Sequence, residues 1–188
     1  MDLAEVIRSR RSIGLFNDAP VSLELVHELL DSAVYAPNHR LTEPWRFIVV
    51  TGTGRERYAE IRRDMVLDFM KGQSEAERSQ AAEGTYRKFM NVPLYLLVVM
   101  SKQTNAEIDE EDYAACCCVI QNFMLLAWER RLGTTWKTFK NDARLREYLA
   151  LGESERVVGI VHAGYSAEEE RAGQRKPATE RIQVLDGK

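Results

Sequence analysis

Three consecutive polar residues near the N-terminus have the chemistry of an anion-binding site. Arg10, Arg11 and Ser12 end or follow a short stretch, residues 2–10, whose apolar side chains recur at helical spacing. Cations at a helix C-terminus also complement the helix dipole, and that alternative explains one or two arginines without any ligand. It explains neither the hydroxyl nor the apolar residues that come next. Because forked guanidinium groups and a hydroxyl match phosphate oxygens, we interpret the segment as a candidate phosphate clamp.

Two further segments carry residue types that are suited to binding. The loop of residues 37–45 holds two prolines, an asparagine, a histidine and a tryptophan between an expected helix and an expected strand. Tight-turn chemistry alone is the alternative for that loop. Residues 134–138 read Thr-Thr-Trp-Lys-Thr and offer a flat stacking surface beside hydrogen-bond donors. Both segments are candidates for contact with a planar ligand.

Other catalytic and cofactor motifs are absent or incomplete in this sequence. Gly52-Thr53-Gly54 follows a predicted strand, but Arg57 stands where a dinucleotide loop has its third glycine. The spacings of His27, His39 and His162 match no zinc motif, so we expect no metal site. We expect His27 to face solvent and His162 to be a satisfied core residue. The sequence has neither a GxSxG elbow nor a P-loop, and hydrolase and NTPase classes therefore have no support.

The composition of the 188-residue chain is that of an ordinary globular domain. Apolar residues make up 45% and charged residues 29%, with a net charge of −3, which gives no global basis for binding nucleic acid or anionic lipid. The N-terminus lacks the features of a signal peptide, and residues 114–128, the most apolar stretch, are too few to span a bilayer. Adjacent residues on a helix point about 100° apart, so Cys116, Cys117 and Cys118 cannot converge on one metal. We expect reduced core cysteines and a cytoplasmic protein.

Hydrophobic periodicity predicts helices that alternate with a few strands. Ser22 is the expected N-cap of the second helix, and Gly133 is the expected C′ residue of the longest one. Residues 182–185 could form a last short strand, which could join a partner's sheet. This pattern predicts a helix-rich α+β domain with a small central sheet. The expected helices cover about residues 2–10, 22–36, 55–70, 77–90, 109–132 and 142–151, and the expected strands 47–50, 95–100, 134–139 and 157–165.

Together, these segments resemble the nitroreductase family of flavin enzymes. Arg10-Arg11-Ser12 with Ile13 is similar to the RRS(I/V) opening of that family, and Trp136-Lys137-Thr138 is similar to its W(K/R)(S/T) segment. Five motifs occur in the family order over essentially the whole chain. The other three are Ala36–Arg40 with Pro44–Phe47, which resembles AP(N/S/D)H…PW.F, Val158–Tyr165, which resembles VG…GY, and Arg175–Pro177, which resembles a basic RxP segment.

The resemblance implies a fold, a cofactor and a set of site residues. The implied fold is α+β, with helices around a central, mainly antiparallel sheet, in an intertwined homodimer that binds FMN at the subunit interface. Residues 1–188 would be a single domain, with residues 166–188 a C-terminal arm on the partner subunit. Carried over, Arg10, Arg11 and Arg175 would hold the FMN phosphate and Ser12 the ribityl chain; Trp136, Lys137 and Thr138 would line the isoalloxazine; Tyr35, Pro37, Asn38 and His39 would approach from the other subunit.

The implied reaction is a ping-pong oxidoreduction in which the flavin carries the chemistry. NADH or NADPH would give hydride to the flavin, and a nitroaromatic, quinone or activated enone would then take the electrons. The chain departs from the family at Gly14, where many members carry a cation near the flavin, and Lys137 is our candidate substitute. Two alternatives remain, namely another FMN activity such as reductive dehalogenation or enoate or ring oxidoreduction, and a non-catalytic flavin-binding protein. Neither a nucleic acid nor a membrane is an expected partner.

Overall fold

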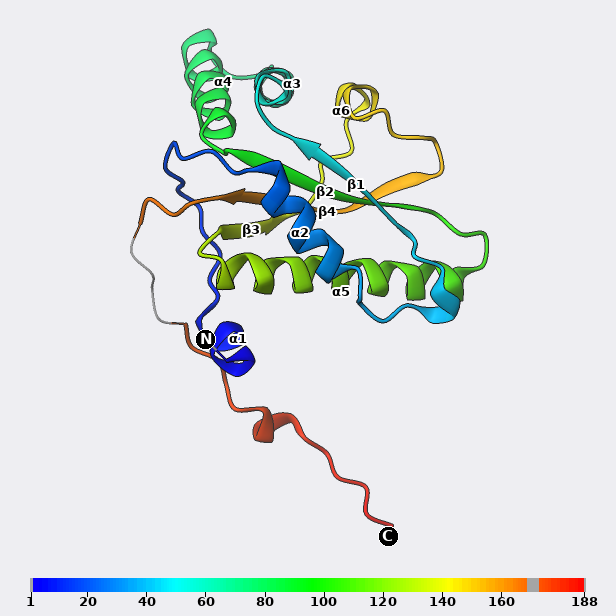
Figure 1. Ribbon diagram of the computed structural model, residues 1–188. Coiled ribbons are helices and arrows are strands. Elements are labelled where there is room, and N and C mark those ends of the chain that lie inside the picture. Colours follow the sequence, from blue (N-terminus) through cyan, green and yellow to red (C-terminus); the bar gives the residue numbers. More distant parts are fainter. Residues whose placement is uncertain (1, 169–172, 188) are drawn as a thin grey trace.

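A four-stranded antiparallel sheet forms the centre of the protein (Figure 1). The computed structural model describes residues 2–168 and 173–187. The strand order is β1-β2-β4-β3, and every neighbouring pair is antiparallel, which confirms the predicted mainly antiparallel sheet. The strands are β1 (Trp45–Val50), β2 (Leu94–Ser101), β3 (Gly133–Lys137) and β4 (Glu155–Gly164).

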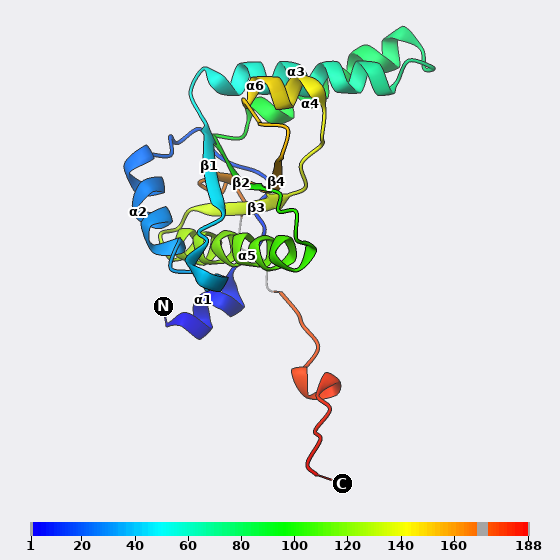
Figure 2. The same ribbon diagram turned by 90° about the vertical axis from the view of Figure 1, so that its right-hand side faces the viewer.

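Helices cover both faces of this sheet (Figures 1 and 2). On one face lie α5 (Ala106–Glu129) and α2 (Leu23–Ala33), with α1 (Leu3–Ser9) against α5. On the other face lie α3 (Gly54–Phe69), α4 (Glu75–Met90) and α6 (Ala143–Tyr148). Burial on both faces explains why β2 reads as a continuous apolar run, since Leu94 to Met100 are all buried. None of the helices in the described part of the chain is both long and apolar enough to cross a membrane.

The helix ends show where the local prediction was right and where it was wrong. Ser22 caps α2, because its hydroxyl accepts a hydrogen bond from the Leu25 amide at 3.1 Å, as predicted. Gly133 is not the C′ residue of α5, because α5 ends at Glu129 and Gly133 begins β3. The positive φ that follows the helix belongs to Arg131 (61°). A Cβ at position 133 would lie 2.8 Å from the Ile13 side chain, so glycine is needed there for close packing.

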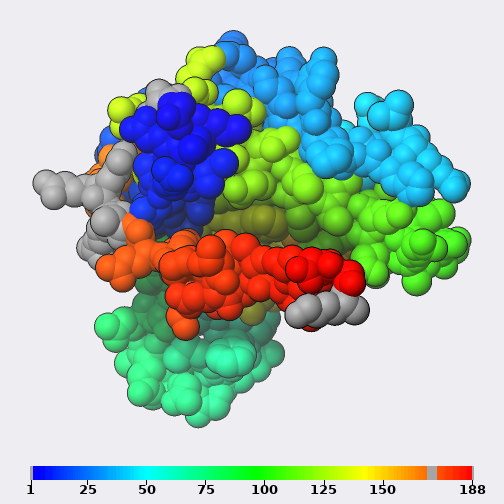
Figure 3. All heavy atoms as spheres, turned by 90° about the horizontal axis from the view of Figure 1, so that it is seen from below, coloured from blue at the N-terminus to red at the C-terminus, as the bar shows by residue number. Residues whose placement is uncertain are grey.

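The C-terminal segment leaves the body of the protein below α5 (Figures 1 and 3). Apart from a short 3-10 turn, Ala178–Arg181, the described residues 173–187 form no regular element. Ile182–Leu185 are in no strand of this chain, so that part of the prediction is wrong, whereas pairing with a partner's sheet stays a prediction. Ile182, Val184 and Leu185 are exposed, and none of the described residues covers them.

Two predictions about single side chains are also confirmed. His27 is exposed on α2, and Cys116, Cys117 and Cys118 are free thiols. Burial raises the pKa of Cys116 to about 12, which makes it an inert thiol of the core. No group of three or more potential metal ligands occurs among the described residues.

Candidate functional site

Three arginines gather where α1 ends. Arg10 is the C-cap of α1, and the pKa of its guanidinium is lowered by burial and then by the charges of Arg11 and Arg175. The tail reaches these side chains through Gly173, where a Cβ would lie 2.6 Å from Nε of Arg11. The structure therefore brings together the three arginines that the sequence analysis assigned to a phosphate, although Arg175 is more than 160 residues from the other two in the chain.

One nitrogen of this cluster is buried without a partner. None of the described residues forms a hydrogen bond with Nη1 of Arg10. Arg11 donates to the main-chain oxygens of Arg8 (2.8 Å) and Arg10 (2.6 Å), and Arg175 donates to that of Gln174 (2.7 Å). An unsatisfied buried donor on a cation costs free energy unless an acceptor joins it. The cluster thus has the charge and the spare donor that a phosphate requires.

Hydrogen bonds to β3 connect the arginines to the sheet. Ser12, which is exposed, forms a parallel bridge with Thr134, and the Ile13 amide donates to the Thr134 oxygen at 3.0 Å. The Thr135 hydroxyl in turn donates to the Ile13 oxygen. This pairing fixes the segment after α1 along the outer edge of β3. Whatever binds the arginines consequently lies next to the residues that follow Thr134.

A cavity of about 320 Å³ opens beside that edge. Lys137, which the resemblance places beside the isoalloxazine, lines it, and so does Gly14, where the family cation is missing. Lys88 of α4 and His162 of β4 also line it, and the sequence analysis missed both as site residues. A wider hollow of about 630 Å³ shares Gly14 and Lys88 and continues along α4 past Gly84. The other residues around the smaller cavity are Ile13, Leu15, Phe89, Val92 and Thr135.

Two residues of the predicted Trp136–Thr138 segment face away from this cavity. Side chains alternate along a strand, so Trp136 points to the opposite face from Lys137. The Trp136 ring lies over Gly159, where a Cβ would be 2.8 Å from its Cε2 atom, and packs on the core beside α5. Thr138 borders a separate hollow together with Phe139 and Arg156. Of the three residues, the structure places only Lys137 beside the cavity.

The second predicted group lies elsewhere in the same chain. Tyr35 is 89% exposed, Pro37 is exposed, and both follow α2. The Asn38 side-chain amide donates to the Ala36 oxygen (3.3 Å), and Nδ1 of His39 lies 2.7 Å from Oε2 of Glu111 on α5. None of these four predicted residues lines the cavity beside β3. If they contribute to one site with the arginines, they do so from another subunit.

The loop that carries this second group is strained. Arg40 (54°), Leu41 (52°) and Glu43 (43°) all have positive φ, and Leu41 is 80% exposed. Positive φ is unfavourable for residues other than glycine, and such strain is concentrated at functional sites. The Glu43 amide donates to Oδ1 of Asn38 at 3.1 Å, which helps to hold the loop in this conformation.

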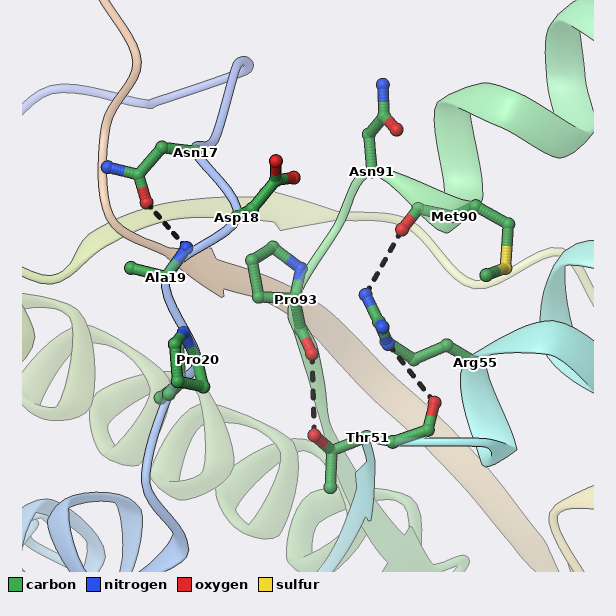
Figure 4. Close-up of a pocket in the computed structure, with 11 residues that line it drawn as sticks. Asn17, Asp18, Ala19, Pro20, Thr51, Arg55, Met90, Asn91 and Pro93 are labelled. Atoms are coloured by element: carbon green, nitrogen blue, oxygen red, sulfur yellow. Dashed lines mark hydrogen bonds between the residues drawn. The ribbon is translucent and has the colours of Figure 1, made fainter.

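A further hollow, of about 330 Å³, lies between β1, the end of α4 and residues 17–21 (Figure 4). Its cation is already engaged, because the Arg55 guanidinium donates to the main-chain oxygens of Gly52 (3.2 Å), Met90 (3.1 Å) and Val92 (3.2 Å). These bonds satisfy carbonyls at the end of α4 and explain the arginine by a structural role. No residue predicted for binding lines this hollow.

Comparison with known proteins decides the family. The model of the "Nitroreductase family" matches residues 7–165. The chain belongs to the nitroreductase family. YfhC of Bacillus subtilis (strain 168), whose name assigns it provisionally to the NAD(P)H nitroreductases, is 35% identical over an alignment of 187 positions that covers 96% of this chain and 92% of YfhC. The predicted resemblance is therefore confirmed.

Solved structures of the family have the same fold. The crystal structure of a nitroreductase-like family protein from Bacillus cereus is 35% identical, has a TM-score of 0.85, and is matched over 100% of this chain and 97% of that one. The FMN and NADPH-dependent nitroreductase NfnB from sphigopyxis sp. strain HMH has a TM-score of 0.78 at 20% identity, with 100% of both chains covered. The second likeness shows the nitroreductase fold alone. These matches confirm the predicted fold.

For this nitroreductase chain, the family match and the structure cover different parts of the candidate site. The matched residues 7–165 include Arg10, Lys137 and His162 but end before the tail. Arg175 is therefore assigned to the site by its position beside Arg10 and not by the family match.

Proposed function

We propose that the protein is an FMN-dependent oxidoreductase that takes hydride from NADH or NADPH and reduces nitroaromatic, quinone or related small acceptors. The observation that carries this proposal is the cluster of Arg10, Arg11 and Arg175 around a buried, unpartnered Nη1 atom. The family supports it, as do the names of two relatives, which mention NAD(P)H for YfhC and FMN and NADPH for NfnB.

The residues present fit the parts of FMN. The arginines suit the dianionic phosphate, and the exposed Ser12 beside Thr134 suits the polar ribityl chain. The cavity next to β3 suits the ring, because it is built mainly from apolar side chains with two lysines. When bound, FMN supplies the chemistry by accepting hydride and passing electrons on.

The lysines of the cavity replace the cation that is missing at Gly14. Lys137 was the substitute expected from the sequence, and the structure adds Lys88 as a second cation of the same cavity. Positive charges beside a ring that becomes anionic on reduction lower the free energy of the reduced form. The task of the protein is then to hold, orient and tune the cofactor while donor and acceptor use the same face in turn.

The complete site, in this proposal, is shared by two subunits. Tyr35, Pro37, Asn38 and His39 would reach the ring of the partner subunit, and residues 166–188 would lie along the partner. Three observations support this, namely the strained and exposed loop, the separation of these residues from the cavity, and the exposed apolar residues of the tail. The free cysteines suit a reducing compartment, and action in the cytoplasm is part of the proposal.

We expect the FMN-bound protein to be a dimer. Light scattering of the purified holoprotein is expected to give twice the mass of the chain, because four of the seven predicted ring contacts come from the other subunit. A monomeric mass with FMN bound would contradict the shared site. It would not contradict the proposal that the arginine cluster binds the phosphate, because one chain supplies all three arginines.

We expect NADH or NADPH to bleach the bound flavin under anaerobic conditions. Stopped-flow absorbance with each nucleotide measures this, and reoxidation by a quinone and by a nitroaromatic then tests the acceptor class. Failure of both nucleotides would favour another FMN activity, such as reductive dehalogenation or enoate or ring oxidoreduction. A protein that neither carries flavin absorbance nor binds added FMN would refute the proposal altogether.

A further inference from the structure

His162 occupies the centre of a row of side chains that runs across the sheet. Its neighbours in register are Tyr95 on β2 and Thr135 on β3. The imidazole meets the Tyr95 ring edge-on, with centroids 4.9 Å apart, and the Phe89 ring in the same manner at 6.1 Å. These aromatic contacts fix the orientation of the imidazole, and its remaining side borders the cavity that Lys137 and Gly14 also line.

The two hydroxyl groups in register with His162 are engaged elsewhere. The Tyr95 hydroxyl donates to the Phe89 oxygen, and the Thr135 hydroxyl donates to the Ile13 oxygen. Among the described residues, none forms a hydrogen bond with His162. The imidazole is half-buried, so whether it is satisfied, as the sequence predicts, depends on water or a ligand and not on the described residues. A polar group in such a position costs free energy unless a ligand or water pairs with it.

The surroundings also determine the protonation state of this side chain. Burial is the main cause that lowers the pKa of His162 to about 4, and the charges of Lys137, Arg62 and Lys88 lower it further. Tyr95, which faces it from β2, stays neutral because burial raises its pKa. At neutral pH the imidazole is therefore uncharged, with one nitrogen that donates and one that accepts a hydrogen bond.

We propose that His162 contacts the bound cofactor directly, as a hydrogen-bonding residue on the floor of the cavity that orients the flavin ring. The complementary ligand is a planar heteroaromatic ring whose edge carries both N–H and C=O groups, since a purely apolar ring would leave the imidazole unpaired. An uncharged imidazole adds this contact without adding a third positive charge to those of Lys88 and Lys137. The inference rests on the proposed function, because it takes the cavity to be the place of the ring.

The test compares FMN affinity among three variants of the full-length protein. His162→Leu keeps an apolar floor but removes the hydrogen bond, and its Kd for FMN is expected to rise about 3- to 10-fold, with a shifted flavin absorption maximum. His162→Gln retains a donor and an acceptor and is expected to stay within about 2-fold of the unmodified protein. His27→Leu, on the exposed face of α2, is the matched control and is expected to change nothing. Fluorescence titration with FMN measures all of them without requiring turnover.

Each outcome separates this inference from the proposed function. If the unmodified protein binds FMN and His162→Leu binds it equally well with an unchanged spectrum, water satisfies the imidazole and the inference is overturned, while the proposed function stands. If the unmodified protein binds no FMN, both fail. The ratio of Kd between His162→Gln and the unmodified protein is expected to be the same at pH 5.5 and pH 8, about 1.5 units or more above the lowered pKa. A ratio that changes over this range would contradict a neutral imidazole.

Discussion

Replacing Arg10 and Arg175 together by alanine is expected to weaken FMN binding by a factor of about 10² to 10⁴. Each charge-assisted hydrogen bond to a phosphate contributes about 1.5–3 kcal/mol, and the double variant removes two of the three guanidinium groups. Arg10 alone should account for the larger share, because its Nη1 atom is already buried and has no other partner. Fluorescence titration with FMN measures the loss, and added salt should weaken binding to the unmodified protein more than to the variant.

Two controls separate phosphate recognition from general damage. The double variant Arg8→Ala/Arg181→Ala removes the same total charge from α1 and the tail, outside the cluster that perturbs Arg10, and is expected to keep FMN affinity within about 3-fold. Riboflavin has the ring and the sugar alcohol but no phosphate, so its affinity should be nearly equal in the unmodified protein and in Arg10→Ala/Arg175→Ala. An equal loss for riboflavin and FMN would show that the arginines support the fold and not the phosphate.

The pairing of Arg10 with Arg11 in the cluster was predictable because these residues are adjacent in the sequence. Two guanidinium groups and a hydroxyl in a row make a candidate phosphate clamp without any knowledge of the fold. Strand β2 was equally predictable, because it is buried on both faces and must read as a continuous apolar run. Adjacent charges and continuous apolar runs are properties that a sequence shows directly.

The cavity was not predictable, because four distant segments build it. Lys88 stands in the last turn of α4, where the helix dipole already explains a cation, and His162 stands within an apolar strand, where a core position explains it. The register of β4 with β3 and β2 places His162 beside Thr135 and Tyr95, and the packing of α4 brings Lys88 to the same hollow. Trp136 and Lys137 are adjacent in the sequence and were predicted to line the same ligand. Neighbours in a strand point to opposite faces, however, so only Lys137 lies beside the cavity.

The same substitution, glycine to alanine, is expected to have opposite effects at two positions of this protein. Gly159→Ala should lower the free energy of unfolding by about 2 kcal/mol, since the new methyl group would lie 2.8 Å from Cε2 of Trp136 and push the ring off the sheet. Gly84→Ala should raise it by about 0.5–1 kcal/mol, because position 84 is exposed within α4 and no atom lies within 4 Å of its Cβ. Urea unfolding of both variants measures the two shifts.

The two glycine variants also test the candidate site, because β3 carries Trp136 and Lys137 on opposite faces. When the Trp136 ring is displaced, its emission should move to longer wavelength, and the strand that places Lys137 beside the cavity loses its main packing contact on the α5 side. We therefore expect Gly159→Ala to weaken FMN binding as well. Gly84→Ala should leave the Kd for FMN within about 2-fold, because it adds only a methyl group to the wider hollow along α4. A Gly159→Ala variant with unchanged stability and emission would show that Trp136 does not lie over this glycine in solution. That result would also contradict the assignment of β3 as the strand that orients Lys137 towards the cavity.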